Sequence, residues 1–278
     1  MSLLRQQMID LMTVRNFSPR THASYLFSMV SLVKYFRRSP EELTQDDLQN
    51  YLIYLIKEKG LAPASCRLQW HAIRFFYSHV LHWPELTLEV QYPGRPQRIP
   101  ELLTRSEVIR ILEVPDNVKH QSMLKTCYST GLRISELLTL KVADIDSERM
   151  LLRIDQGKGA KDRLVPLPPV LLDCLRQYWR QARPQSWLFP SEQTLRPLHP
   201  TSISKVFKEA KQRAGITKKG GIHSLRHAYA THSLEQGMPI HLLQRWLGHR
   251  SLHTTLRYVH WVPAYNPGEA EVYDLLAV

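Results

Sequence analysis

Seven of the chain's thirteen histidines lie between His223 and His260, close to several arginines and to Tyr258. They occur in two segments: HSLRHAYATH, which begins at His223, and LGHRSLHTTLRYVH, which ends at His260. Three interpretations of this crowding are open. It is a metal site, a cationic site for a negatively charged substrate, or a pair of helices that happen to carry histidines.

A metal site is the least favoured of the three. His223 and His227 are four residues apart, as are His249 and His253, and this spacing lets two ligands share one helix face. Zinc sites with that spacing usually add cysteine or a carboxylate, as in HExxH, but no cysteine is nearby and no glutamate separates these histidines. We therefore expect no metal and no cofactor. Four histidines we expect only to satisfy helix ends or to face solvent: His227, His232, His241 and His253.

A site for an anion fits the residues better. Arg226 lies three residues after His223, so both can project from one edge of a helix start, where backbone N–H groups favour phosphate. His249 follows Gly248, and Tyr258 lies nine residues further on, flanked by cations. A phenol with a reference pKa of about 10 is ionised only to about one part in a thousand at neutral pH. Tyr258 is therefore a candidate nucleophile where cations stabilise its phenolate.

Two more cations and one acid extend this candidate phosphate site. Arg133, in TGLRISEL, lies at the expected entrance to a helix, and Glu136 is placed to hold its guanidinium. Lys158 lies at the tip of an expected hairpin, where a mobile ammonium can reach a site and donate a proton. Two arginines in forked contact with non-bridging phosphate oxygens would stabilise the charge that builds up in phosphoryl transfer.

The composition favours a polyanionic partner. Lys and Arg number 37 against 25 Asp and Glu, a formal net charge of +12, which favours nucleic acid over a membrane. No apolar run approaches the roughly 18 residues of a membrane span, and the N-terminus lacks a signal-peptide core. Cys66, Cys127 and Cys174 are odd in number and widely spaced in apolar patterns, which predicts buried free thiols. We expect a soluble cytoplasmic protein.

The elements that must position these residues fall into two groups separated by a linker. Residues 1–83 predict helices only, with Ser18 as a helix N-cap before Pro19 and a further helix start at Thr44. Residues 84–103 are rich in proline and show little periodicity, as linkers do. Residues 104–278 predict more helices and one β-hairpin, in MLLRIDQGKGAKDRLVPL.

Four segments, in order, resemble the tyrosine recombinase or phage integrase family, especially its compact Xer-like and transposon-borne members. They are TGLRISEL, GKGAKDRLVPL, HSLRHAYATH and LGHRSLHTTLRYVH. The resemblance covers the whole chain, because the N-terminal bundle looks like the family's SAM-like core-binding domain. It implies a mainly α fold, with a DNA-binding helical domain at 1–83, a linker at 84–103, and a mostly helical catalytic domain with a small antiparallel sheet at 104–278.

The resemblance also implies residue roles and a reaction. Glu136 matches an acidic position that supports the first catalytic arginine. Double-stranded DNA with specific recombination sites would be cleaved and rejoined through a 3′-phosphotyrosyl link and a Holliday junction, by a homotetramer with no cofactor and no named accessory protein. Integron integrases carry an insertion before the H-x-x-R box for which this chain leaves no obvious room. The implied catalytic set is Arg133, Lys158, His223, Arg226, His249 and the nucleophile Tyr258.

Alternatives remain for the reaction and for two further features. A type IB topoisomerase would use the same chemistry but rejoin the original strand, and a DNA-binding protein without catalysis would only bind. A basic face formed by Arg20, His22, Arg67 and Arg74 predicts DNA contacts or a solvated surface. The apolar tail at 261–278 needs a surface to cover it, on its own subunit or on a neighbour in the tetramer.

Overall fold

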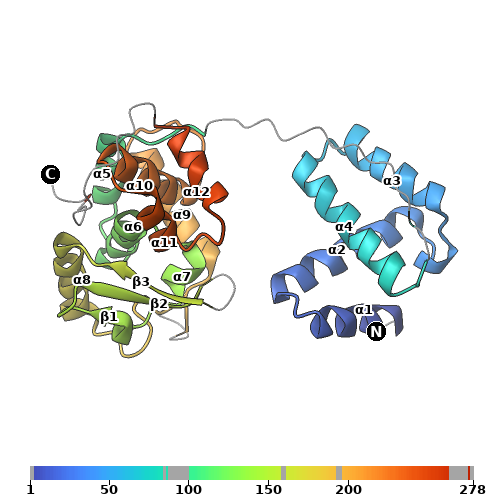
Figure 1. The fold of residues 1–278 in the computed structure, drawn as a ribbon, viewed down its shortest axis with the longest axis horizontal. Coiled ribbons are helices and arrows are strands. Elements are labelled where there is room, and N and C mark those ends of the chain that lie inside the picture. The colour runs from blue at the N-terminus through green and yellow to red at the C-terminus, as the bar shows by residue number, and fades with distance from the viewer. Residues whose placement is uncertain are drawn as a thin grey trace. The chain divides into compact units, whose positions relative to one another are not determined.

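The structure is a computed structural model that describes residues 3–83, 86, 100–157, 161–191, 196–262 and 275. The chain forms two compact units, Met1–Gln97 and Arg98–Val278, called here the N-terminal and C-terminal units. Each has a hydrophobic core of its own. Figure 1 shows the helices and strands of both units. Among the described residues, no helix is long and apolar enough to cross a membrane.

The N-terminal unit is helical. Ser18 caps its second helix by accepting the backbone N–H of Thr21 at 3.2 Å, and Thr44 forms a reciprocal capping box with Asp47. Apolar residues at helical spacing then bury one face of each helix, and Tyr77 donates a hydrogen bond to the Pro40 carbonyl at 2.8 Å. Its α-helices are α1 (Leu3–Val14), α2 (Pro19–Phe36), α3 (Gln45–Lys57) and α4 (Pro63–His79).

The C-terminal unit combines helices with a small antiparallel sheet of order β1-β2-β3. The predicted hairpin is present, with Leu152 opposite Val165, and β1 is an added strand that the sequence did not indicate. The strands are β1 (Ile145–Asp146), β2 (Leu151–Gly157) and β3 (Lys161–Pro166). The α-helices are α5 (Arg105–Glu113), α6 (Val118–Thr130), α7 (Ile134–Leu138), α8 (Pro169–Ala182), α9 (Pro200–Arg213), α10 (His223–Glu235), α11 (Ile240–Leu247) and α12 (Leu252–Val259).

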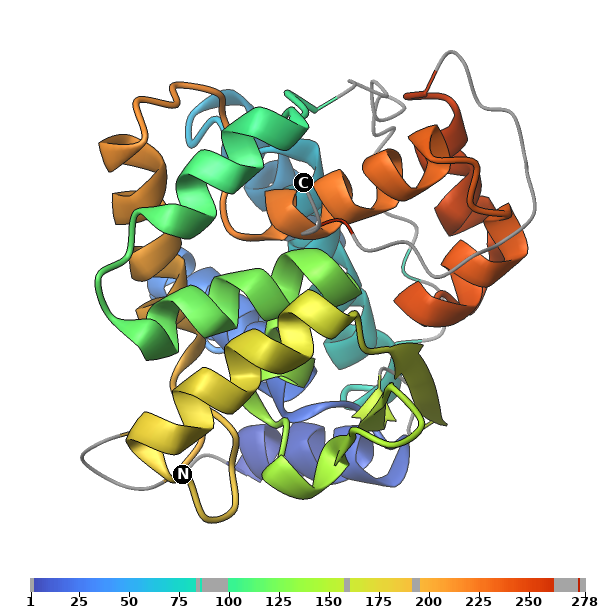
Figure 2. The ribbon, with the colours of Figure 1, turned by 90° about the vertical axis from the view of Figure 1, so that its left-hand side faces the viewer.

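Helix α6 lies between α8 and α10 in the centre of this unit (Figures 1 and 2). Because neighbours cover most of its sides, its buried polar side chains bond to protein groups, several of them within the helix itself. Thr126 and Thr130 each donate to the carbonyl four residues earlier, at 2.7 and 2.6 Å. Helix α10, buried along most of its length, packs on α6 and on α12. The segments that carry the candidate site are therefore held by the core.

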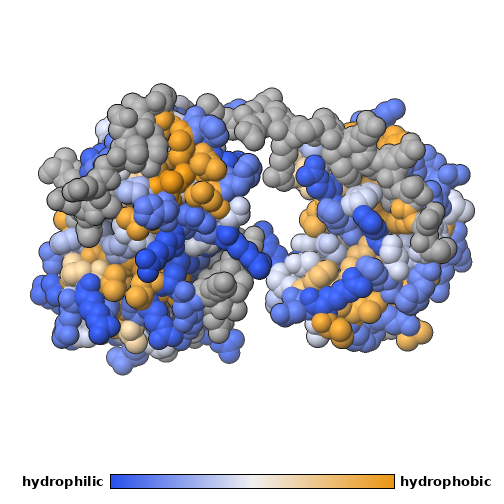
Figure 3. All heavy atoms as spheres, in the orientation of Figure 1, coloured by the Kyte–Doolittle hydropathy of each residue, from blue (hydrophilic) through white to orange (hydrophobic). Residues whose placement is uncertain are grey.

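The prediction of a mainly α fold with a small antiparallel sheet is confirmed. The visible face of the C-terminal unit is mainly hydrophilic, with apolar residues in separate patches (Figure 3).

One expectation about the cysteines is wrong. Cys66 and Cys127 are buried free thiols, but Cys174 is only partly buried, because it lies on α8 near Asp173 and Arg176, where the helix meets solvent.

Candidate active site

The structure gathers most of the predicted site residues around one cavity of about 230 Å³ in the C-terminal unit. Arg133 reaches it from the start of α7, His223 and Arg226 from α10, His249 from the turn before α12, and Tyr258 from α12. Lys158 lies outside the described residues. The remaining lining residues are His227, Thr254, Arg257 and Trp261.

Arg226 is fixed by backbone carbonyls. Its Nη1 donates to Gly131 at 2.6 Å and its Nη2 to Leu247 at 2.7 Å, and its side chain is buried. Gly131 adopts φ +60, and a Cβ there would lie 2.4 Å from the Tyr229 ring, so the turn requires glycine. Burial, together with the charge of Arg133, lowers the pKa of Arg226 to about 10. The guanidinium therefore remains charged at neutral pH.

His249 is neutral and has a defined tautomer. Its Nε2 lies 3.0 Å from Arg226 Nη2 and its Nδ1 lies 2.9 Å from Thr255 Oγ1. Because a guanidinium can only donate, Nε2 accepts, and the ring proton is on Nδ1 and points to Thr255. Burial and the charges of Arg226, Arg133 and Arg163 lower the pKa of His249 to about 3.

Glu136 holds two arginines. It accepts from Arg133 Nη1 at 2.7 Å and from the Arg133 backbone N–H at 2.8 Å, and it accepts a two-bond fork from Arg163 at 2.9 and 2.7 Å. Burial alone would raise the pKa of Glu136, but the hydrogen bonds and charge of Arg163, with the bonds from Arg133, lower it to about 2. The carboxylate therefore stays ionised and orients Arg133 toward the cavity.

Sequence reasoning missed Arg163. Besides holding Glu136, it donates from Nε to the Trp246 carbonyl at 2.9 Å, so β3 is tied to the end of α11. One signal was available: Arg163 lies two residues before the buried Val165, and alternate residues of a strand face the same side.

Tyr258 is buried, with 5% of its surface exposed, and its hydroxyl lies 3.1 Å from His227 Nδ1. The His249 ring is nearly parallel to the phenol at 6.2 Å, and Trp261 meets it edge-on at 5.1 Å. Burial raises the pKa of Tyr258, and the charges of Arg226 and Arg257 partly offset that rise. The phenol is therefore protonated in this state, with two cations nearby.

The expectation for His227 is wrong, because this residue neither caps a helix end nor simply faces solvent. Its ring lies between His223, at 4.8 Å, and Tyr258, at 5.7 Å. Burial and the charges of His223, Arg226 and Arg257 lower the pKa of His227 to about 4. The sequence held a signal for it, since His227 follows His223 by four residues and shares its helix face.

The four residues of the predicted basic face lie in the N-terminal unit, with Arg20 and His22 on α2, and Arg67 and Arg74 on α4. Arg74 is exposed, and its guanidinium carbon lies 5.2 Å from the Trp70 ring. Burial and the charges of Arg67 and Arg74 lower the pKa of the neighbouring His71. Arg67 and Arg74 therefore both lie near His71, on the same part of the α4 surface.

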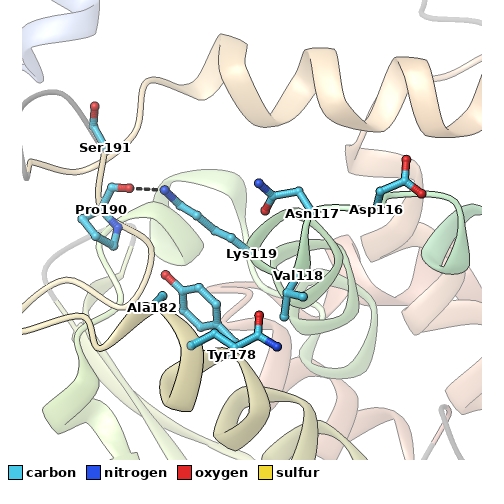
Figure 4. Close-up of a pocket in the computed structure, with 9 residues that line it drawn as sticks. Asp116, Asn117, Val118, Lys119, Tyr178, Ala182, Pro190 and Ser191 are labelled. Carbon is cyan, nitrogen blue, oxygen red and sulfur yellow. Dashed lines mark hydrogen bonds between the residues drawn. The ribbon is translucent and has the colours of Figure 1, made fainter.

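A second hollow in the C-terminal unit, of about 570 Å³, lies where the start of α6 meets the end of α8 (Figure 4). Lys119 crosses it to donate to the Pro190 carbonyl, and Asp116 on its rim pairs with Arg213 at 3.2 Å. The charged side chains Lys119 and Asp116 in this hollow are thus already bonded to other residues of the same chain. It shares no lining residue with the 230 Å³ cavity around Tyr258.

The cavity around Tyr258 has the components of a phosphoryl-transfer site: a phenol, two arginines that reach the same space, and histidines next to the phenol. Two family models match the chain. Residues 101–264 match the phage integrase family and residues 4–85 match the phage integrase N-terminal SAM-like domain. The chain therefore belongs to the phage integrase family, and the resemblance noted from the sequence is confirmed.

Individual relatives agree with this assignment. The Sinorhizobium fredii protein y4qK is 43% identical over 260 residues, covering 93% of this chain and 84% of that protein. The tyrosine recombinase XerD of Oceanobacillus iheyensis is 31% identical, with 88% and 89% covered. The crystal structure of XerA recombinase aligns at 27% identity with a TM-score of 0.55, covering 92% of each chain. The chain is accordingly an enzyme of the tyrosine recombinase type.

A structure of XerH, described as a site-specific recombinase bound to a palindromic difH substrate, has the same fold. It aligns at 22% identity with a TM-score of 0.72, covering 93% of this chain and 82% of that one.

Proposed function

We propose that this enzyme is a site-specific recombinase that cleaves and rejoins double-stranded DNA through a 3′-phosphotyrosyl bond to Tyr258. One observation carries the proposal: Tyr258 lies in the same 230 Å³ cavity as Arg133 and Arg226. A phosphodiester placed there would contact the nucleophile and the guanidinium groups of both arginines at the same time.

In the proposed reaction the Tyr258 oxygen attacks phosphorus and the 5′-oxygen leaves. Arg133 and Arg226 bind the non-bridging oxygens, and their hydrogen bonds to fixed carbonyls and to Glu136 hold them in place before DNA arrives. Lys158 protonates the leaving 5′-oxygen. The 5′-hydroxyl of a partner strand then attacks the phosphotyrosine and releases Tyr258.

His223 and His249 complete the proposed phosphate site as hydrogen-bond donors. Desolvation in the cavity and the charges of Arg226 and Arg133 lower the pKa of His223, which favours the neutral ring in the DNA-free enzyme. A neutral imidazole still donates through one ring N–H. For His249 to donate through Nε2, its ring proton must move from Nδ1 to Nε2 when the Arg226 bond is exchanged for the phosphate oxygen, and the Thr255 hydroxyl then donates to Nδ1.

DNA is the proposed partner because of the net charge of +12 and because the structurally similar XerH is described as bound to its difH substrate. We assign DNA binding to residues 1–83, which would form one half of a clamp around the duplex, with a catalytic domain at 104–278 as the other half. A linker at 84–103 joins the two halves. The proposed DNA contacts of the first half are Arg20, His22, Arg67 and Arg74. The proposed active form is a homotetramer on two sites that exchanges strands through a Holliday junction. Its three free cysteines fit a cytoplasmic enzyme.

The test begins by finding the DNA site. The full-length Tyr258→Phe variant is used to select from a library of random duplexes, and the recovered sequence is built into a duplex nicked beside the cleavage position. We expect the wild-type protein to form a covalent adduct with this duplex that survives detergent, and Tyr258→Phe to form none. An adduct with Tyr258→Phe would contradict the proposal. A two-site recombination assay, run beside plasmid relaxation, distinguishes a recombinase from a topoisomerase.

A further inference from the structure

We propose that His227 is a catalytic residue, which accepts the phenolic proton of Tyr258 as that residue attacks the phosphodiester. The inference rests on the proposed function, because it takes Tyr258 as the nucleophile. Its basis is the direct contact between the two side chains, 3.1 Å from Nδ1 to the phenol oxygen. That distance is within the reach required of a general base.

The other groups around the phenol are poorly suited to take this proton. Arg226 is a permanent donor with no acceptor atom. His249 has Nε2 against Arg226 and Nδ1 against Thr255, so its free lone pair faces a cation. The His223 ring packs edge-on against His227, whose ring lies between His223 and the phenol. His227 Nδ1 faces the phenol hydroxyl. We assign the hydrogen between them to the phenol, so that Nδ1 accepts it and the ring proton of the neutral imidazole is on Nε2.

The charges around His227 link this proton transfer to DNA. The nearby titratable and charged groups are His223 and Arg226 on α10, Tyr258 and Arg257 on α12, and His249 between α11 and α12. Burial, together with the cations among them, makes a protonated His227 unfavourable while the cavity is empty, so its pKa is about 4. A phosphodiester at the arginines brings one negative charge into the cavity and offsets their field. His227 therefore becomes a stronger base when substrate is bound.

The proton balance of the step is complete. The O–H bond of Tyr258 breaks as the bond from its oxygen to phosphorus forms, and the proton moves to His227 Nδ1. The bond from phosphorus to the 5′-oxygen breaks, and that oxygen takes a separate proton from the general acid. When a 5′-hydroxyl rejoins the strand, its oxygen bonds to phosphorus and its proton returns to the deprotonated general acid. The bond from phosphorus to Tyr258 breaks, and Tyr258 leaves as the phenolate and recovers its proton from His227.

The experiment measures single-turnover cleavage of the selected nicked duplex between pH 5 and pH 8.5. His227→Asn keeps a carbonyl oxygen near the position of Nδ1 but cannot accept a proton, and His253→Asn on the exposed start of α12 is the matched control. We expect the wild-type rate to rise with pH and then level off. His227→Asn should lose about 10²-fold or more of the rate and lose the rising limb, with duplex affinity unchanged. His253→Asn should behave as wild type.

A second DNA duplex distinguishes the role of the general acid, Lys158, from that of the general base, His227. Sulfur in place of the bridging 5′-oxygen gives a leaving thiolate that needs no proton. On this duplex Lys158→Ala should recover cleavage, while His227→Asn should not. The wild-type rate on this duplex should still rise with pH. Because this measurement uses the wild-type protein, it does not depend on whether a variant folds.

The outcomes for the two proposals differ. Full cleavage by His227→Asn, its recovery on the sulfur duplex, or a wild-type rate on that duplex independent of pH would each overturn the role of His227. Covalent attachment by Tyr258→Phe would instead overturn the proposed function.

Discussion

Neutralising Glu136 should destabilise the C-terminal unit, because this single carboxylate balances two guanidinium groups. In Glu136→Gln the amide oxygen still accepts, but the amide N–H groups face Arg133 or Arg163, and both charges lose their anion. The pKa of Glu136 is about 2 against an ordinary value of 4.5. At 1.36 kcal/mol per pKa unit, the ionised form is favoured in the folded state by about 3 kcal/mol. Breaking one side of a buried ion pair typically costs about 3–5 kcal/mol.

The pH dependence has a defined sign. Because folding lowers the pKa, the stabilisation is complete above the unfolded pKa near 4.5 and is lost as the pH falls through about 2. The difference in unfolding free energy between wild type and Glu136→Gln should therefore be about 3 kcal/mol at pH 7. It should shrink to about 2 kcal/mol at pH 3.5.

The assay must measure the unfolding of the C-terminal unit separately from that of the N-terminal unit, because each unit has its own core. Urea titration read by hydrogen exchange of α10 peptides meets this need, since α10 is buried in that unit. Glu209→Gln is the matched control, because Glu209 is exposed and lies 3.8 Å from Lys205. It should change stability by less than about 0.5 kcal/mol. A loss below about 1 kcal/mol for Glu136→Gln, or a loss that is constant with pH, would refute this reasoning.

Three further predictions concern the two arginines, the N-terminal unit and the C-terminal tail. Arg133→Lys and Arg226→Lys keep the charge but lose the planar fork, so covalent cleavage of the nicked duplex should fall by about 10³-fold or more while gel-shift affinity changes little. Residues 1–83 alone should bind duplex DNA weakly, with an affinity that falls steeply with salt in a fluorescence titration; binding independent of salt would count against the clamp. Deleting residues 268–278 removes Leu275, which is buried in the core of its own C-terminal unit, and hydrogen exchange in that unit should rise. Normal exchange and normal recombination would show that the tail is dispensable.

The local features of the fold were predictable because they depend on residues close together in the sequence. Ser18 caps α2 as its place before Pro19 predicts, and Glu136 meets Arg133 because residues three apart lie on one helix face. The hairpin followed from two apolar runs around a glycine-rich turn. The short β1 strand could not be predicted, because two residues carry no periodic pattern.

The tertiary contacts of the site lay beyond such reasoning. Arg163 is 27 residues from Glu136, and His227 is 31 residues from Tyr258. Spacing within a helix or strand says which residues share a face but does not say which face meets another element. The packing of α10 on α12 turns His227 from one of several histidines on a helix into the hydrogen-bond partner of the phenol.

The end of α11 explains how the site holds several arginines with few acids. Three consecutive carbonyls there each accept from a different arginine: Trp246 from Arg163, Leu247 from Arg226, and Gly248 from Arg133. The C-terminal end of a helix carries unpaired carbonyls and partial negative charge, so it stabilises cations without a full anion. Additional carboxylates in their place would repel a phosphodiester and lower the field that the phosphate needs. Holding the arginines by a helix end fixes their positions and leaves most of their positive charge for the substrate.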